Sequence, residues 1–214
     1  MVPIDGHPFL EFVLHPLSRC GMSRVVLCVG YKRSHIQKWF RQGRKWGVDI
    51  SYAIEASPLG TGGALANAAP MLEGTWIFVL NGDTFVDLDF SAMLHFHRDR
   101  GANATVALTT VTDSSRYGSV VINSAGQIVG FQEKQAVNQV GAKSLINAGV
   151  YLFNRNEIDN IPPVRPVSME KEVLPSIMAR NGLFGFHTEG YFIDIGVPED
   201  LLRARIEMPK ALHQ

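Results

Sequence analysis

Between residues 24 and 101, apolar runs typical of strands alternate with amphipathic runs typical of helices. The run RVVLCVG (24–30) is rich in β-branched residues and lacks polar alternation, as expected for a strand that is covered on both faces. Further strand patterns lie at 48–54 and 76–83, and a helical pattern follows each of the three. This order predicts a parallel sheet that is covered by helices.

The pattern changes after residue 104, where strand patterns follow one another with little helix between them. Ser124–Gln127 predicts a hairpin turn within this part of the chain. A second helical pattern begins at Ser168, and a short strand and a closing helix end the sequence. We therefore predict one α/β domain, residues 1–214, with a nucleotide-binding type of first half and antiparallel additions in the second half. The four strand patterns are at 104–111, 118–123, 128–134 and 145–153.

Composition and charge exclude several classes of protein. The sequence has 20 Lys and Arg against 20 Asp and Glu, so neither nucleic acid nor an anionic membrane is expected as its main partner. It has no apolar run of transmembrane length and no signal-peptide pattern, which favours a cytoplasmic protein. Cys20 and Cys28 are too few for a disulfide framework, and we expect both to be buried as small apolar residues.

Two aspartates at strand patterns are the first candidates for chemistry. Asp83 ends the run WIFVLNGD, and Asp194 lies between two isoleucines. A carboxylate beside buried apolar residues needs a cation or strong hydrogen bonds, and ligands of open α/β sheets bind beyond the carboxyl ends of strands. Because Mg²⁺ prefers one or two carboxylates together with phosphate oxygens, we predict that Asp83 and Asp194 share a Mg²⁺. The alternative for Asp194 is a structural salt bridge with an arginine.

A cluster of glycines, Gly60-Thr61-Gly62-Gly63, lies between a strand pattern and a helical pattern. Glycines let a backbone approach a ligand closely, and the N–H groups at the start of a helix attract phosphate. The spacing matches neither GxxxxGK[ST] nor GxGxxG, so a dinucleotide-binding oxidoreductase is a weak alternative. Taken alone, the cluster favours a tight loop with positive φ over a phosphate site.

Three further polar residues lie beside strand patterns. Glu133 and Lys134 are adjacent, so they face opposite sides of a strand unless a bulge or a strand end reorients one of them. Lys134 is either a phosphate-binding charge or a solvated surface lysine. Asn147 precedes Ala148-Gly149, a small pair that leaves room for a sugar or else marks a bulge.

Six segments occur in the order found in the sugar-1-phosphate nucleotidyltransferases: PLGTGGA, LNGDTF, RYGSV, FQEK, INAGVYLF and FIDIGVPEDL. The chain resembles this family over nearly its whole length, and it looks most similar to the D-glycero-α-D-manno-heptose-1-phosphate guanylyltransferases. The resemblance implies a Rossmann-like three-layer α/β/α domain with a mixed, mainly parallel central sheet and a small antiparallel addition. It also implies that a nucleoside triphosphate, here GTP, reacts with a sugar 1-phosphate to give a nucleotide sugar and pyrophosphate.

The resemblance implies a role for each candidate residue. Asp83, Asp194 and Lys134 would be catalytic, with the two aspartates as Mg²⁺ ligands and the lysine on the sugar phosphate. The nucleotide would contact Glu55, Gly60, Thr61 and Gly62, and the sugar would contact Tyr117, Gly118, Glu133, Lys134, Asn147 and Gly149. No protein nucleophile is required, because catalysis depends on positioning and on neutralising charge. The implied enzyme works in surface-polysaccharide synthesis and is a possible homo-oligomer.

The family begins with an apolar strand, a GGxGTRxRP loop and a Pro-Lys-Pro. This sequence begins with Met1-Val2-Pro3-Ile4, which matches the segment just after that lysine. We therefore expect the first strand to be absent and its two neighbours in the sheet to have unpaired edges. Three explanations stay open: a fragment or misassigned start of a full enzyme, a catalytically inactive truncated relative, and a regulatory protein that binds sugar phosphate or nucleotide.

Overall fold

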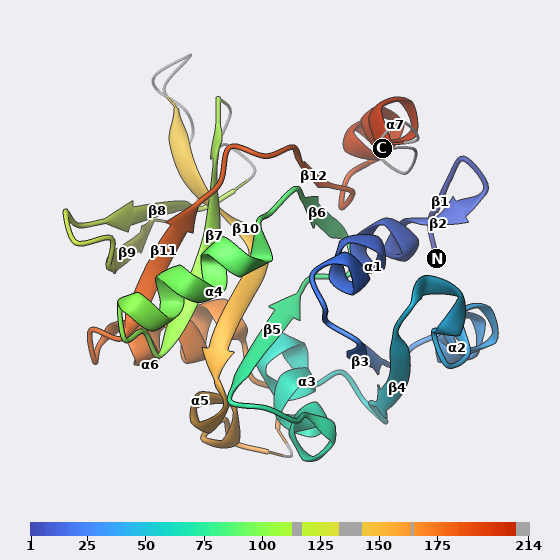
Figure 1. The fold of residues 1–214 in the computed structure, drawn as a ribbon, viewed down its shortest axis with the longest axis horizontal. Helices are drawn as coiled ribbons and strands as arrows, with labels where there is room; N and C mark the ends of the chain where they lie inside the picture. Colours follow the sequence, from blue (N-terminus) through green and yellow to red (C-terminus); the bar gives the residue numbers. More distant parts are fainter. Residues whose placement is uncertain (113–116, 133–142, 164, 209–214) are drawn as a thin grey trace.

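The computed structural model describes residues 1–112, 117–132, 143–163 and 165–208 (Figure 1). Helices lie at Phe9–Arg19 (α1), Arg33–Phe40 (α2), Gly60–Ala68 (α3), Phe90–Asp99 (α4), Arg155–Asp159 (α5), Leu174–Met178 (α6) and Pro198–Glu207 (α7). Short 3-10 or π turns lie at Arg44–Trp46, Ala69–Met71 and Met169–Val173. Strands lie at Pro3–Ile4 (β1), His7–Pro8 (β2), Arg24–Val29 (β3), Asp49–Ile54 (β4), Trp76–Leu80 (β5), Thr84–Val86 (β6), Ala104–Val111 (β7), Ser119–Ile122 (β8), Ile128–Gln132 (β9), Ser144–Asn154 (β10), Leu183–His187 (β11) and Phe192–Asp194 (β12).

The central sheet is mixed. Its strands follow the order β11-β7-β10-β8-β9, and β5 pairs with the other half of β10. The prediction of a mainly parallel sheet is wrong in this sheet, where β11 and β7 are parallel but β10 is antiparallel to β5, β7 and β8. The physical reason is the long strand β10, which returns through the middle of the sheet and pairs with strands on both sides. The predicted parallel arrangement is present in the separate pair β3 and β4.

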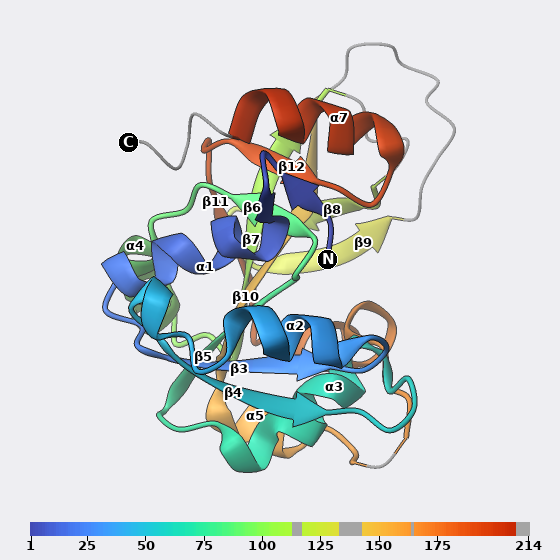
Figure 2. The ribbon, with the colours of Figure 1, turned by 90° about the vertical axis from the view of Figure 1, so that its right-hand side faces the viewer.

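Helices cover both faces of the sheet, as predicted for a three-layer fold (Figures 1 and 2). Alternate residues of β10 divide between two cores. Tyr151 and Phe153 lie in the core that contains Leu65 of α3 and side chains of α5 and α6. Val150 and Leu152 lie in the core that α1, α2 and α4 complete. This alternation is the period of two expected of a strand that is buried on both faces.

Strand β3 is less covered than its sequence predicts. Val25–Leu27 are only half-buried, and Cys28 is exposed, although the apolar run predicted a strand covered on both faces. The reason is that β3 pairs with β4 on one edge, while its other edge has no ladder within the described parts of the chain. Strand β5 likewise pairs with β10 alone among the described strands. The expected pair of unpaired edges is therefore present, at β3 and β5.

Some local predictions were wrong. Cys20 and Cys28 are free, but both are exposed and not buried as predicted. Cys20 follows the end of α1, and Cys28 lines a cavity beside β3. The short strands β6 and β11 were not predicted from the sequence. Asp89 caps α4, since its carboxylate accepts a hydrogen bond from the Ala92 N–H at 2.9 Å. In the residues that the structure describes, no helix is both long enough and apolar enough to cross a membrane.

Because His97 is buried, we expect the folded chain to lose stability in mild acid. Thr105 Oγ1 lies 2.8 Å from its Nδ1, and Asn154 Oδ1 lies 3.1 Å from its Nε2, so the neutral ring is held on both sides. Burial lowers the pKa of His97 below its ordinary value, although the bond to Asn154 opposes this. A depressed folded pKa means that the unfolded chain binds more protons, so the free energy of unfolding should fall as the pH drops below about 6.5. Urea unfolding at several pH values measures this.

The matched control is His97→Gln, which cannot titrate. Its unfolding free energy should change less between pH 7.5 and 5.5 than that of the unmodified chain. Equal slopes for the two proteins would contradict the assignment to His97.

Candidate active site

Asp83 and Asp194 come from neighbouring segments of the fold. Asp83 lies in the turn between β5 and β6, and Asp194 ends β12, which pairs antiparallel with β6. The Ile195 N–H donates to the Asp83 carbonyl at 3.0 Å, and Asp194 is opposite Thr84 in the ladder. Because Asp83 precedes β6, strand alternation does not fix the direction of its side chain. The backbone thus brings the two aspartates next to each other from positions over 100 residues apart.

Each of the two carboxylates accepts one of the side-chain hydrogen bonds found among the described residues, which leaves oxygen lone pairs for a ligand. Asp83 Oδ1 accepts a long hydrogen bond of 3.4 Å from the Thr84 hydroxyl. Asp194 Oδ1 accepts from the Gly196 N–H at 2.7 Å. Within the described residues neither aspartate forms an ion pair with Lys or Arg, so the salt-bridge alternative for Asp194 finds no support there. Asp83 is exposed and Asp194 is half-buried, which suits groups that bind a ligand from solvent.

A bulge in β10 places Asn147 beside this turn. The register of β10 against β7 shifts between Asn147 and Tyr151, and Gly149 has φ +73°. The Gly149 carbonyl accepts from the Asn81 N–H at 2.9 Å, which ties the bulge to the turn that carries Asp83. The sequence left open whether Asn147-Ala148-Gly149 marks a bulge or a ligand contact. The bulge is present, and it lies beside the candidate ligand residues.

The side chain of Asn147 is held at both ends. Its Oδ1 accepts from the Gly149 N–H at 2.9 Å, and its Nδ2 donates to the Tyr151 hydroxyl at 2.9 Å. One N–H and one oxygen lone pair remain for a ligand. Burial raises the pKa of Tyr151 to about 12, against the effect of Asn147, so its hydroxyl stays protonated. Tyr151 was not predicted as a site residue, although a tyrosine hydroxyl within the apolar run VYLF needs a partner.

The family model for nucleotidyl transferases matches residues 1–210. The chain belongs to this family. Mannose-1-phosphate guanylyltransferase of Mycobacterium tuberculosis is 36% identical, over 99% of this chain and 59% of its own length. D-glycero-alpha-D-manno-heptose 1-phosphate guanylyltransferase of Aneurinibacillus thermoaerophilus is 33% identical, over 97% of this chain and 88% of its own length. The structure of HddC from Yersinia pseudotuberculosis complexed with GMP-PN is 31% identical, with a TM-score of 0.85 over 97% of this chain and 88% of that one.

These matches confirm the predicted resemblance and the mixed α/β fold of this chain. The relatives differ in the share of their own length that this chain covers. The chain spans 59% and 56% of the mannose-1-phosphate relatives from Mycobacterium tuberculosis and Dictyostelium discoideum, but 88% of the heptose-1-phosphate relative.

In this chain the glycine cluster at the start of α3 is used for internal packing. The N–H groups of Gly62 and Gly63 both donate to the Val167 carbonyl, at 2.9 and 3.2 Å. A Cβ at Gly60 would lie 2.7 Å from that same carbonyl oxygen, and Gly60 has φ +70°. The Thr61 hydroxyl accepts from the Met169 N–H at 3.1 Å. The predicted positive φ is present at Gly60, but residues 60–63 form the first turn of α3 and not a loop before it, and the N–H groups of Gly62 and Gly63 are engaged within the chain.

The other predicted contacts lie around this cluster and around β12. Glu55 follows β4 and accepts from the Leu59 N–H at 3.2 Å, so it orders the approach to the glycine cluster. Tyr117 packs edge-on against Phe192 of β12, with ring centroids 5.8 Å apart. Gly118 leaves space for the Gln132 carbonyl, which would lie 2.9 Å from a Cβ there. Glu133 and Lys134 lie outside the described residues.

Proposed function

We propose that this nucleotidyl transferase transfers GMP from GTP to a sugar 1-phosphate, giving a GDP-sugar and pyrophosphate. The observation that carries the proposal is the meeting of Asp83 and Asp194 beside the Asn147 bulge. In the proposed reaction a phosphate oxygen of the sugar attacks the α-phosphorus of GTP. The bond to the β-phosphate breaks as the new bond forms, and pyrophosphate leaves.

The donor set of the two aspartates fits Mg²⁺. Both are hard oxygen ligands with unused lone pairs, and both are open to solvent in part. Among the described residues no group of three or more His, Cys, Asp and Glu could hold a metal ion, so a Mg²⁺ at these two aspartates would need phosphate oxygens or water as its other ligands. When bound there, Mg²⁺ would neutralise charge on the phosphates.

We propose a heptose 1-phosphate as the sugar substrate. Identity does not distinguish the two sugars, because the mannose-1-phosphate and heptose-1-phosphate relatives are similarly close at 36% and 33%. The segments NGDTFVDLD, RYGSV and YFIDIGVPED support the heptose compound, because they look most similar to those of the D-glycero-α-D-manno-heptose-1-phosphate guanylyltransferases. In the proposed complex, Asn147 bonds a sugar hydroxyl, and Tyr117 and Gly118 border the sugar.

The experiment supplies GTP and Mg²⁺ with either D-glycero-α-D-manno-heptose 1-phosphate or mannose 1-phosphate, and measures pyrophosphate release and GDP-sugar. We expect product with the heptose compound at a higher kcat/KM. Product with mannose 1-phosphate alone would replace the proposed sugar and keep the reaction. The reaction itself is contradicted if neither sugar gives product, both with this chain and with a version that carries the family's GGxGTRxRP segment at its N-terminus.

A binding protein is the second candidate function. The N–H groups of Gly62 and Gly63 favour it, because both donate to the Val167 carbonyl and are therefore engaged within the chain instead of with a nucleotide phosphate. Calorimetry distinguishes the two: saturable binding of sugar phosphate without product supports the binding protein, and turnover contradicts it.

Removing the Tyr151 hydroxyl should weaken binding of the sugar substrate. In Tyr151→Phe, the Nδ2 of Asn147 loses its acceptor at 2.9 Å, so the amide is no longer fixed toward the ligand. We expect the KM for sugar 1-phosphate to rise about fivefold with a smaller change in kcat, because one hydrogen bond is worth about 1 kcal/mol. Steady-state kinetics at saturating GTP measure this. Tyr52→Phe is the matched control, since its hydroxyl donates to the Arg41 carbonyl away from the site. Equal effects of the two substitutions would contradict the positioning role.

A further inference from the structure

The stretch of residues 12–48 carries charge of one sign only. It holds eight of the 20 Lys and Arg residues and none of the 20 Asp and Glu residues. The zero net charge of the whole chain conceals this excess, because all the acidic residues lie before or after the stretch. Six of the eight cations belong to α2 and to the turns that flank it, and we call these six the basic face: Lys32, Arg33, Lys38, Arg41, Arg44 and Lys45.

The charges of the basic face are uncompensated. All six side chains are exposed, and none forms an ion pair within the part of the chain that the structure describes. Five arginines elsewhere do pair with carboxylates: Arg24, Arg155, Arg165, Arg180 and Arg203. Of the two acidic residues that bound the stretch, Glu11 is buried and Asp49 is exposed. One exposed carboxylate leaves most of the positive charge unopposed.

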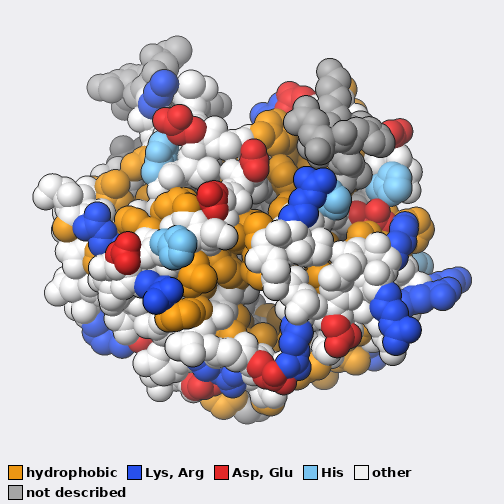
Figure 3. Space-filling model, viewed as in Figure 1, with side chains coloured by type: hydrophobic (Ala, Val, Ile, Leu, Met, Phe, Trp, Pro, Cys, Tyr) orange, Lys and Arg blue, Asp and Glu red, His pale blue; other side chains and the backbone are white. Residues whose placement is uncertain are grey.

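The element that carries the basic face is fixed on the body of the molecule. Trp39 of α2 donates its indole N–H to Glu11 of α1 at 2.6 Å, and the rings of Phe40 and Trp46 pack with their centroids 4.8 Å apart. Figure 2 shows α2 on the outside of the molecule, toward the viewer. In Figure 3, Lys and Arg side chains gather at the right-hand edge, where α2 lies in Figure 1. The six cations therefore lie on an outer surface whose backbone is held in place.

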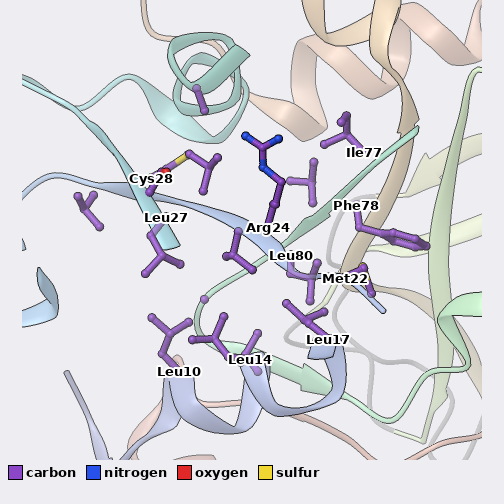
Figure 4. A pocket seen from close by; sticks show the side chains of 18 of the residues that line it. Leu10, Leu14, Leu17, Met22, Arg24, Leu27, Cys28, Ile77, Phe78 and Leu80 are labelled. Carbon is purple, nitrogen blue, oxygen red and sulfur yellow. The ribbon is translucent and has the colours of Figure 1, made fainter. Parts of the chain in front are cut away.

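The other two cations of the stretch, Arg19 and Arg24, are not part of the basic face. Arg19 ends α1. Figure 4 shows the guanidinium of Arg24 among the apolar side chains that line the cavity beside β3, and Arg24 pairs with Glu73. None of the six residues of the basic face lines that cavity. The basic face is thus a surface distinct from the cavity.

Three aromatic residues lie among the six cations. The ammonium group of Lys32 lies 5.1 Å from the ring centroid of Tyr31, and that of Lys45 lies 5.1 Å from the ring centroid of Trp46. Trp39 is 43% exposed although its N–H is bonded. A ring that an ammonium group covers does not offer that face for a nucleic-acid base to stack on. Lys and Arg together with Trp and Tyr are instead typical of segments that lie at the surface of a bilayer.

We propose that the basic face docks this chain on the surface of an anionic lipid bilayer. Each Lys or Arg close to such a surface strengthens binding about fivefold, and the six act together because one fixed element holds them. The apolar side chains of α2, Ile36 and Phe40, pack into the core of the molecule, so the contact is electrostatic and does not insert a helix. The zero net charge argued against a membrane as the main partner of the whole chain, whereas this contact depends on a local excess of charge.

The test measures sedimentation of the whole chain with vesicles, in the absence of nucleotide and sugar. One set of vesicles contains equal parts of phosphatidylglycerol and phosphatidylcholine, and the other contains phosphatidylcholine alone. We expect binding to the anionic vesicles at low NaCl concentration and none to the neutral vesicles. Binding should be lost at high NaCl concentration, because salt screens exposed charges.

The variant Lys38→Gln/Arg44→Gln/Lys45→Gln removes half of the basic face. Its partition coefficient on the anionic vesicles should fall about a hundredfold, because three factors of about five are lost. The three side chains are exposed and form no ion pair among the described residues, so the fold should be kept. Urea unfolding of the variant verifies this.

The matched control is Arg98→Gln/Arg100→Gln/Arg205→Gln. It has the same net charge as the first variant, but its three exposed arginines lie on or beside α4 and on α7, outside the basic face. Its partition coefficient should fall less than about threefold if binding depends on the basic face and not on the total charge.

Four outcomes overturn the proposal. The first is no binding to anionic vesicles at low salt, and the second is equal binding to neutral vesicles. The third is an equal loss of binding in the two triple variants, which assigns the effect to net charge. The fourth is displacement from the vesicles by an oligonucleotide at equal phosphate concentration, which makes a nucleic acid the partner. None of these outcomes depends on guanylyl transfer, so the proposal stands or fails independently of the proposed function.

Discussion

Replacing Asp194 with asparagine should reduce kcat for guanylyl transfer about 10²–10³-fold, the loss that follows the removal of one well-placed electrostatic group. The asparagine side chain has nearly the same size and keeps an oxygen for the Gly196 N–H, from which Asp194 Oδ1 accepts at 2.7 Å. The local backbone should therefore be preserved while one charged ligand for Mg²⁺ is lost. Asp83→Asn should have a comparable effect, because the two residues lie on paired segments.

The control for this pair is Asp87→Asn, which removes an exposed carboxylate four residues after Asp83. Its kcat should change less than twofold, as is usual for a surface substitution away from the site. The dependence of rate on Mg²⁺ provides the second readout. Asp83→Asn and Asp194→Asn should each require more Mg²⁺ for half-maximal rate, whereas Asp87→Asn should not. Full activity of Asp194→Asn at the ordinary Mg²⁺ concentration would remove the carboxylate pair from the proposed mechanism.

Much of the fold could be predicted because its signals are local. The strand patterns at 48–54 and 76–83 located β4 and β5, and the helical pattern after each of them located α3 and α4. The short strands β6 and β11 were missed because three to five residues carry too little pattern. The long return strand β10 was recognised as a strand, but its central position in the sheet is a matter of long-range pairing that a single segment does not reveal.

The sequence indicated the two acidic residues of the candidate site more clearly than the contacts of its glycines. Asp83 and Asp194 stood out because a carboxylate beside apolar strand residues requires a partner. The glycine cluster could not be interpreted in the same way. The acceptor of the Gly62 and Gly63 N–H groups is the carbonyl of Val167, a backbone atom about a hundred residues away that no local pattern indicates. The half-exposed state of β3 likewise depends on which segment lies beside it.

The second large effect that we expect is on stability and substrate binding, and it follows from replacing Gly149 in the bulge of β10. Gly149 has φ +73°, and a Cβ there would lie 2.9 Å from Asn81 Nδ2 and 3.3 Å from Asn81 Cβ. The same glycine donates to Asn147 Oδ1 and accepts from the Asn81 N–H, both at 2.9 Å. An added methyl group must therefore shift either Asn81, which lies at the start of the turn that carries Asp83, or the bulge itself, whose Gly149 N–H holds Asn147.

Gly149→Ala should lower the free energy of unfolding by about 1–3 kcal/mol, the cost of a residue held in a sparsely populated backbone conformation. It should also raise the KM for sugar 1-phosphate by more than Tyr151→Phe does, because the backbone partner of Asn147 moves together with the side chain. Gly126→Ala is the matched control: Gly126 has φ +80°, but the nearest atom to its Cβ is a Phe96 ring carbon at 3.8 Å. That variant carries the same conformational strain without the contact to Asn81, so it should lose stability and keep its KM. Urea unfolding and steady-state kinetics on both variants separate strain from displacement, and equal KM values would show that the bulge does not position the sugar.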